Sequence, residues 1–192
     1  MLAGGVFGLI RHVQTRPIER PPGVLAPHAP FQAQLTPQSD VRLEKPGFQF
    51  RPVARFELEA RVLSARHYRH DAAAAISPVD LALGWGRMSD TAVIQKLNIR
   101  QSDRFYFYSW SQEPPIPVGE IVASSANMHL IPGNPNLEPR LKRIKPGHIV
   151  RIKGFLVNVT GPNGFYWTTS TVRHDTGHGA CEIVWVSDLV VR

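Results

Sequence analysis

Two apolar stretches near the C-terminus decide the fold: HIVRIKGFLVNV (148–159) and CEIVWVSDLVV (181–191). Between them lie the turn GPNG (161–164), the segment FYWTTSTV (165–172) and the loop HDTGHGA (174–180). Apolar runs separated by Gly, Pro and Asn predict a meander of three or four strands. Gly154 interrupts the first strand, which is typical of small Greek-key barrels of the oligonucleotide/oligosaccharide-binding (OB) type, because a glycine lets a strand bend sharply.

Upstream of residue 148, strand patterns alternate with short helix patterns. RFELEARV (55–62) places apolar and charged side chains on opposite faces, and RFYFYSW (104–110) and NMHLI (127–131) also alternate like strands. Capping residues and apolar spacing predict helices over 78–83, from Ser89 or Asp90 to about Asn98, from Pro117 to about Ser124, and after Asn136. The sequence therefore predicts an α+β fold with a mainly antiparallel, barrel-like (OB-like) sheet and a few short helices.

The N-terminal part of the chain is expected to be extended. Prolines are frequent between residues 16 and 52, and no apolar periodicity accompanies them, so residues 1–52 are interpreted as an apolar segment followed by a Pro-rich arm. Residues 53–192 are expected to form a single β-rich α+β domain. LAGGVFGLI (2–10) is shorter than the roughly 20 residues that span a bilayer. It is either the remnant of a signal or anchor or an ordinary chain end.

Composition excludes several classes of protein. The 192 residues are 43% hydrophobic and 19% charged, which is typical of a globular domain and excludes a disordered, collagen-like or coiled-coil chain. The single cysteine, Cys181, excludes an internal disulfide and any zinc site built from several cysteines. The net charge of +7 indicates a basic protein, so anionic partners have to be considered.

A first candidate site lies in SPVDLALGWGRMSD (77–90). The two glycines that flank Trp85 free the backbone around a large aromatic ring, which can line a pocket for a ligand. Alternatively, Trp85 fills the core beside a chain turn, as buried aromatic residues commonly do.

A second candidate lies in SSANMHLIP (124–132). In a strand, Asn127 and His129 point to the same face, because side chains alternate. A hydrolase could use His129 as general base and Asn127 as an orienting or oxyanion-binding amide, with Asp80 or Asp175 as the carboxylate partner. The alternative is a buried histidine with a structural role, since no nucleophile motif is visible.

A third candidate is the loop from Arg173 to Glu182. Cys181 follows a loop that contains His174 and His178, which suggests a thiol enzyme, but a cysteine that opens an apolar strand is more often a small buried side chain. The histidines lack a third ligand and an HExxH pattern, so no metal site and no cofactor is predicted. Arg173 and Asp175 are expected to join Trp85, Asn127 and His129 in a ligand-binding surface.

A fourth candidate is a basic segment with no acidic residue between positions 140 and 153. Side chains of this kind can contact phosphates or an anionic lipid surface, although a basic solvated face is also common. The aromatic residues 155 and 165–167 could supply stacking surfaces for bases. The segment contains Arg140, Lys142, Arg143, Lys145, Arg151 and Lys153.

Several segments together resemble a family of bacterial proteins of uncharacterised function. They are RPIERPPGVLAP (16–27), SPVDLALGWGRMSD (77–90), SANMHLIP (125–132), KPGHIVRIKGFL (145–156) and DTGHGACEIVWV (175–186). The resemblance implies a short membrane-anchored or exported, periplasmic protein, and it brings no activity, cofactor or catalytic residue with it. This chain has a shorter apolar N-terminus than that family, so a cytoplasmic location stays open.

These observations favour a non-catalytic binding or assembly module at or near a bacterial membrane. Its expected partner is a protein or another envelope component, and the N-terminal segment can contact the membrane. The alternatives are a hydrolase that uses His129 with Asp80 or Asp175, and a nucleic-acid binder that uses the basic segment 140–153. The ligand, the oligomeric state and the origin of residues 2–10 are not determined by the sequence.

Overall fold

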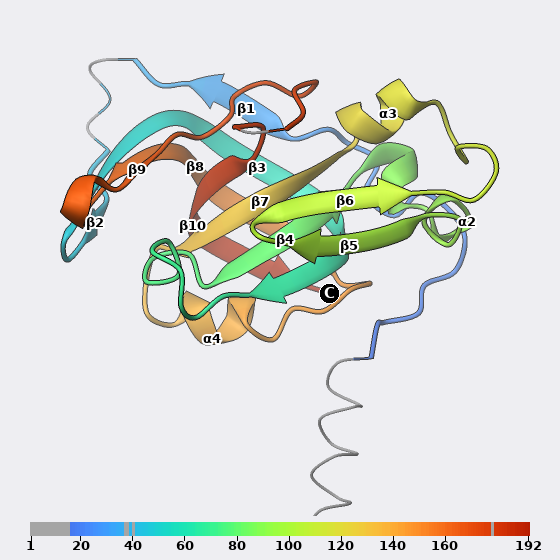
Figure 1. Cartoon of the computed structure of the whole chain (residues 1–192), viewed down its shortest axis with the longest axis horizontal. Helices are drawn as coiled ribbons and strands as arrows, with labels where there is room; N and C mark the ends of the chain where they lie inside the picture. Colours follow the sequence, from blue (N-terminus) through green and yellow to red (C-terminus); the bar gives the residue numbers. More distant parts are fainter. Residues whose placement is uncertain (1–15, 37–38, 40, 178) are drawn as a thin grey trace, which may run out of the picture.

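The computed structural model describes residues 16–36, 39, 41–177 and 179–192 (Figure 1). The apolar segment 2–10 and His178 lie outside the described residues. The strands are β1 (Phe31–Gln34), β2 (Glu44–Lys45), β3 (Phe48–His67), β4 (Val79–Gly84), β5 (Asn98–Ser102), β6 (Phe105–Ser109), β7 (Ser125–Pro132), β8 (Ile149–Thr160), β9 (Tyr166–Trp167) and β10 (Glu182–Val191). The helices are η1 (Gly86–Ser89), α2 (Thr91–Ile94), α3 (Val118–Ala123), α4 (Leu137–Leu141) and η2 (Pro162–Gly164).

The main sheet of the described chain closes into a ring of five strands. Its order is β3, β4, β7, β10 and β8, and β8 pairs again with the long strand β3. All pairs in the ring are antiparallel except β7 with β10, which run parallel, so the sheet is mixed. The dominance of sheet is thus confirmed, and the few short helices agree with the predicted α+β class.

One buried apolar cluster receives side chains from every strand of this ring. Phe56, Leu81, Met128, Ile152 and Val184 represent β3, β4, β7, β8 and β10 in it, and all five are inaccessible to solvent. A core drawn from all strands of the ring fixes their register, because a slip of one residue would turn each strand's apolar face outward.

The prediction of a helix over residues 78–83 is wrong. Val79–Gly84 form β4, which pairs with Arg61–His67 on one side and with Ser125–Leu130 on the other. All six of its residues are buried, and a short apolar run of this kind fits a central strand as well as a buried helix. Pairing on both edges of the strand overrides the helix-capping pattern of Ser77 and Pro78.

The other predicted elements are confirmed with shifted ends, but the last three strands do not form the predicted meander, because β10 pairs with β8 and β7 rather than with β9. The strand patterns at 55–62, 104–110 and 127–131 belong to β3, β6 and β7. The helix expected from Asp90 to Asn98 ends at Ile94, and β5 begins at Asn98. The strand expected over 165–172 is reduced to Tyr166–Trp167, because the Thr169 amide donates to the Asn158 side chain rather than to the β8 backbone.

Gly154 of β8 lies against the backbone of β10. A Cβ at this position would be 1.8 Å from the carbonyl oxygen of Trp185, so any other residue would force the two strands apart. The register between the strands also shifts here, between Val186 and Asp188. The glycine is therefore needed for a close approach that bends the sheet.

The described part of the N-terminal arm runs along the domain surface. The Ile18 amide donates to Pro146 O at 2.8 Å, Arg20 Nε donates to Gly147 O at 2.9 Å, and β1 pairs with β3. Ala26 is fully buried. These contacts tie the arm to the ring over much of its length. No helix in the described ranges is both long and apolar enough to cross a membrane.

The hairpin β5–β6 lies over the outer face of β4 and β7 (Figure 1). An apolar cluster under the hairpin contains Ala82 of β4, with Met88, Ile121 and the β6 tyrosines packed around it. A third apolar cluster, with Ile131 and Ile183, covers the other end of the same face. The polar residues Asp80, Asn127 and His129 lie between these two apolar regions.

Candidate functional site

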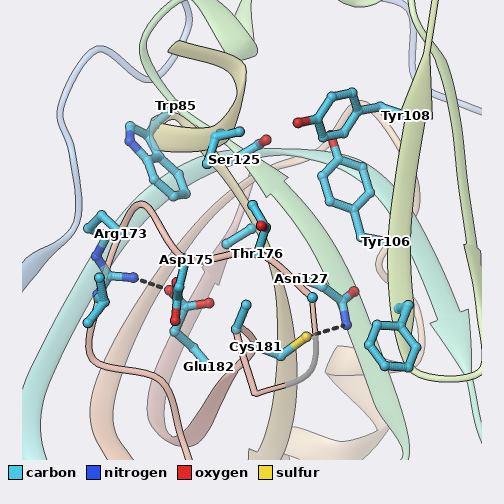
Figure 2. Close-up of a pocket in the computed structure, with 16 residues that line it drawn as sticks. Trp85, Tyr106, Tyr108, Ser125, Asn127, Arg173, Asp175, Thr176, Cys181 and Glu182 are labelled. Atoms are coloured by element: carbon cyan, nitrogen blue, oxygen red, sulfur yellow. Dashed lines mark hydrogen bonds and ion pairs between the residues drawn. The ribbon is translucent and has the colours of Figure 1, made fainter. Parts of the chain in front are cut away.

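A pocket of about 200 Å³ opens between the hairpin and the loop that precedes β10; we call it the Trp85 pocket (Figure 2). Figure 2 shows Arg173 and Glu182 on one side of it and Tyr106 and Tyr108 on the other. The remaining lining residues are Trp85, Phe105, Val122, Ser125, Ala126, Asn127, Val172, Asp175, Thr176, Gly177, Ala180 and Cys181. Strands of the ring, the β5–β6 hairpin and a loop thus build the pocket together.

Glu182 brings a buried carboxylate to this pocket. The residue is only 2% exposed, and Arg173 Nη1 donates to its Oε1. Its second oxygen, Oε2, is buried and accepts no hydrogen bond from the described residues. Burial is the main cause that raises the pKa of Glu182 to about 7, and the Arg173 charge opposes this shift.

Arg173 and Asp175 are held in place by their own partners. Arg173 Nη2 donates to Gln32 Oε1 on β1, so the arm helps to orient the guanidinium. Asp175 Oδ2 accepts from Ser170 Oγ at 2.5 Å. Two carboxylates and one guanidinium therefore face a pocket that four aromatic side chains also line.

A second pocket of about 340 Å³ adjoins the first one; we call it the Trp167 pocket. It shares Phe105 and Cys181 with the Trp85 pocket, and its other lining residues are Arg104, His129, Tyr166, Trp167, Thr168 and Gly179. We use the word groove for the two pockets together. The groove crosses the outer face of β7 and β10.

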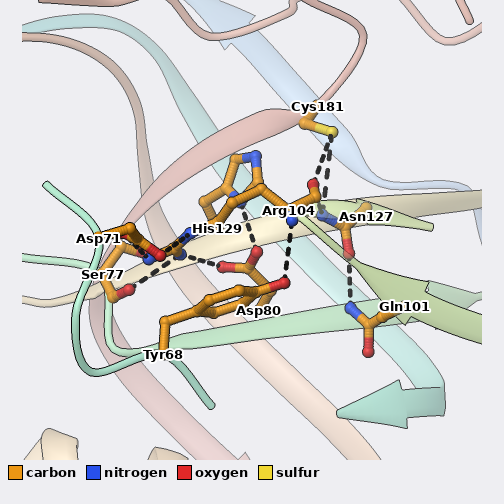
Figure 3. A network of polar contacts seen from close by, with 9 residues as sticks. All are labelled: Tyr68, Asp71, Ser77, Asp80, Gln101, Arg104, Asn127, His129 and Cys181. Carbon is orange, nitrogen blue, oxygen red and sulfur yellow. Dashed lines mark hydrogen bonds and ion pairs between the residues drawn. The ribbon is translucent and has the colours of Figure 1, made fainter. Parts of the chain in front are cut away.

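Arg104 occupies the centre of a polar network beside the groove (Figure 3). Its Nη1 donates to Asp80 Oδ1 at 2.7 Å and to Ser77 O at 3.0 Å, and its Nη2 donates to Asp71 Oδ1 at 2.7 Å. The guanidinium also lies over the Tyr68 ring, at 3.8 Å from its centroid. All three nitrogens of the guanidinium thus donate hydrogen bonds to residues 71–80.

The backbone of Arg104 is held as firmly as its side chain. Asp103 and Arg104 form the tip of the hairpin with φ of 51° and 68°, a conformation that residues with a Cβ seldom adopt. Tyr68 Oη accepts from the Arg104 amide at 3.0 Å, and Asn127 Nδ2 donates to Arg104 O at 2.9 Å. These contacts fix the tip of the hairpin on the ring despite the strained turn.

His129 and Asp80 are in contact, as the hydrolase interpretation requires. His129 Nδ1 lies 2.9 Å from Asp80 Oδ2, although the alignment is too poor for a good hydrogen bond. Asp80 is fully buried, and its other oxygen is taken by Arg104. The Trp167 ring covers His129 at a centroid distance of 4.5 Å, and Asp175 lies in the other pocket.

Asn127 and Cys181 meet at the boundary between the two pockets. Asn127 Oδ1 accepts from Gln101 at 2.6 Å, and its Nδ2 lies 3.8 Å from Cys181 Sγ. Burial raises the pKa of the Cys181 thiol to about 12, so the sulfur is a neutral thiol at physiological pH. The Asn127 side chain therefore makes its hydrogen bonds to the hairpin and not to His129.

The basic segment lies away from the groove, and acidic residues outside the segment face it. Lys142 pairs with Glu138 at 2.5 Å, and Lys153 pairs with Glu57 at 3.2 Å. Arg151 lies 4.0 Å from the same Glu57. Arg140 donates to Leu189 O. Glu57 lies on β3, so the sequence of the basic segment alone does not indicate this partner.

Arg104 and Glu182 are the site residues that the sequence analysis missed. The sequence does point to Glu182, because a single acidic residue at the start of an apolar strand has to be buried or paired. Nothing in the sequence points to Arg104, since its turn lacks the usual Asn-Gly pattern of a hairpin. Among the described residues, no group of three or more His, Cys, Asp and Glu side chains is arranged to hold a metal ion.

Comparisons with protein-family models, with curated proteins and with solved structures found no match for this chain.

Proposed function

We propose that this protein is a non-catalytic binding module whose ligand occupies the groove. We further propose that its ring of strands is an OB-like barrel, in which the groove lies on the outer face of the third and fifth strands, β7 and β10. The segment 161–181 supplies Trp167 and Arg173 to its lining. In OB domains the face of the second and third strands and the adjoining loops form the ligand-binding surface, so the groove shares the third strand and a loop with that surface.

The observation that carries this proposal is the buried, incompletely hydrogen-bonded carboxylate of Glu182 in an aromatic pocket. A buried polar atom without a partner costs free energy, commonly about 1–3 kcal/mol. A ligand that donates to Oε2 would recover this cost, which is the usual reason for such an atom in a binding site. The surrounding rings of Trp85, Tyr106 and Tyr108 offer apolar contact area.

Catalysis by His129 has weaker support than binding. The contact with Asp80 would orient a general base, but the pair is enclosed by Arg104 and Trp167. Within the described chain no serine or cysteine side chain donates to His129. The nucleic-acid alternative is weakened because Glu57 and Glu138 partly neutralise the basic segment. A location at or near a membrane, through residues 2–10, is retained as part of the proposal.

Filling the groove tests the proposal. Ala180 lines the Trp85 pocket from a loop, so Ala180→Trp should occupy the pocket without disturbing the ring. Val190→Trp is the control, since Val190 is exposed on β10 and lines neither pocket. We expect saturation-transfer NMR to detect the neutral probe 2-phenylethanol on the native protein and on the control, but not on A180W. Equal signals from all three proteins, or none from the native protein, would overturn the proposal.

A further inference from the structure

We propose that the Trp85 pocket selects a small aromatic amine, with the ammonium on Glu182 Oε2 and the aromatic ring between Trp85 and the β6 tyrosines. The inference rests on the proposed binding function and specifies its ligand class.

The unmet hydrogen-bonding capacity of the pocket wall favours a donor. Arg173 already gives Nη1 to Glu182 and Nη2 to Gln32, so its outer nitrogens are engaged. Glu182 Oε2, in contrast, is a buried acceptor with no donor among the described residues. Asp175 brings a second carboxylate to the same pocket. A ligand with N–H groups supplies what the wall lacks, whereas an anionic ligand would meet two acids.

The charge balance leads to the same class. Arg173 contributes one positive charge to the pocket lining, and Asp175 and ionised Glu182 contribute two negative charges. With a bound ammonium, the lining and the ligand would therefore have no net charge between them. Removal of charges from water is tolerated only when they are paired and hydrogen-bonded, which this arrangement provides.

The walls favour an aromatic ring next to the ammonium. Tyr106 and Tyr108 have ring centroids 5.5 Å apart, and Trp85 lies across the pocket (Figure 2). Ring faces attract cations and stack with other rings. A cavity of roughly 150 Å³ holds a benzene molecule. The 200 Å³ of this pocket leaves room for a ring with a short alkylammonium.

Isothermal titration calorimetry with three probes of one shape tests the inference: 2-phenylethylamine, 2-phenylethanol and 3-phenylpropionate. We expect the amine to bind tightest and the carboxylate weakest. Glu182→Gln keeps the shape of the side chain and removes its charge, so it should weaken amine binding by about tenfold or more and leave the alcohol within about twofold. Glu59→Gln, at an exposed pair with Arg192, is the matched control and should change neither.

The native protein gives a second test that does not depend on the folding of a variant. The charged groups that act on Glu182 are Arg173 and Asp175, while β6 and β7 contribute only uncharged side chains to the lining. Because the pKa of Glu182 is raised to about 7, amine binding at lower pH requires release of its proton. Amine affinity should increase about tenfold from pH 5 to pH 6 and level off above pH 8.

The outcomes separate the inference from the proposed function. If the alcohol binds as tightly as the amine, or if E182Q binds the amine as well as the native protein does, the amine inference is wrong and the binding proposal stands. The same follows if the amine shows no binding or no pH dependence while A180W still abolishes the alcohol signal. Parallel titration with Phe-Ala-Ala distinguishes a peptide N-terminus from a free amine as the source of the ammonium.

Discussion

Replacement of Arg104 by Met is the most informative perturbation of the polar network. The variant keeps an unbranched apolar side chain over the Tyr68 ring but removes the guanidinium. Asp80, which is fully buried, then loses its charged partner at 2.7 Å. The hairpin tip also loses the anchor between Arg104 and the carbonyl of Ser77.

The expected magnitude follows from these contacts. Removing one partner of a buried ion pair costs about 3–5 kcal/mol, because the other charge stays buried without compensation. The hydrogen bond to Ser77 O adds about 1 kcal/mol, and the partly exposed Asp71 adds between about 0 and 1 kcal/mol. His129 lies close to Asp80 and can offset part of the loss, so we expect R104M to lose about 4 kcal/mol of unfolding free energy.

Urea unfolding at 25 °C, followed by tryptophan fluorescence, measures the loss. Lys153→Met is the control, because its pair with Glu57 is exposed and should contribute no more than about 1 kcal/mol. The double variant R104M with Asp80→Asn removes the stranded charge and should recover about half of the loss. A loss below about 1 kcal/mol in R104M, or a double variant less stable than R104M, would refute the reasoning.

Three further predictions follow from single residues. The pKa of Glu182 is raised from its ordinary 4.5 to about 7, so the native state binds more protons than the unfolded state between these values. Stability should fall by roughly 2–3 kcal/mol from pH 5 to pH 8, and E182Q should flatten the pH profile; a parallel profile would contradict the assignment. The pKa of Cys181 is raised from 9 to about 12, so the thiolate fraction at pH 8 is lower by about 10³ than in the unfolded chain. Dithionitrobenzoate should therefore react far more slowly with the native protein, and equal rates would show an accessible thiolate. Gly154→Ala should cost about 3 kcal/mol or more, because its Cβ meets Trp185 O. Gly119→Ala, in open space on α3, should instead gain about 0.5–1 kcal/mol, and similar thermal shifts for both variants would refute the close-approach argument.

Much of the architecture follows from patterns within single segments. The alternation in residues 55–62 and 127–131 placed strands and assigned their inner and outer faces, so Asn127 and His129 were correctly placed on one side. The helix expected at 78–83 failed because Ser77 and Pro78 give a strong local signal, whereas the pairing of β4 with β3 and β7 depends on segments far apart in the chain. The parallel pairing of β7 with β10 had no sequence signal either.

The candidate site was predictable only where a residue looked unusual in its own segment. Four residues are predicted as site residues from their own segments, and all of them line one pocket: Trp85, Asn127, Arg173 and Asp175. Arg104 acts through partners in residues 68–80 and at Asn127, so its role emerges only in the folded structure (Figure 3). The same holds for the basic segment, whose cross-strand partner Glu57 lies almost a hundred residues upstream.

The most direct test of the binding groove is an amide chemical-shift map of the native protein during titration with the neutral probe 2-phenylethanol. The groove predicts saturable shifts concentrated at Asn127, Ala180, Cys181 and Glu182, with the basic segment 140–153 unaffected. Shifts concentrated in the basic segment, or no saturable shift at these four residues, would contradict the assignment of this groove as the ligand site.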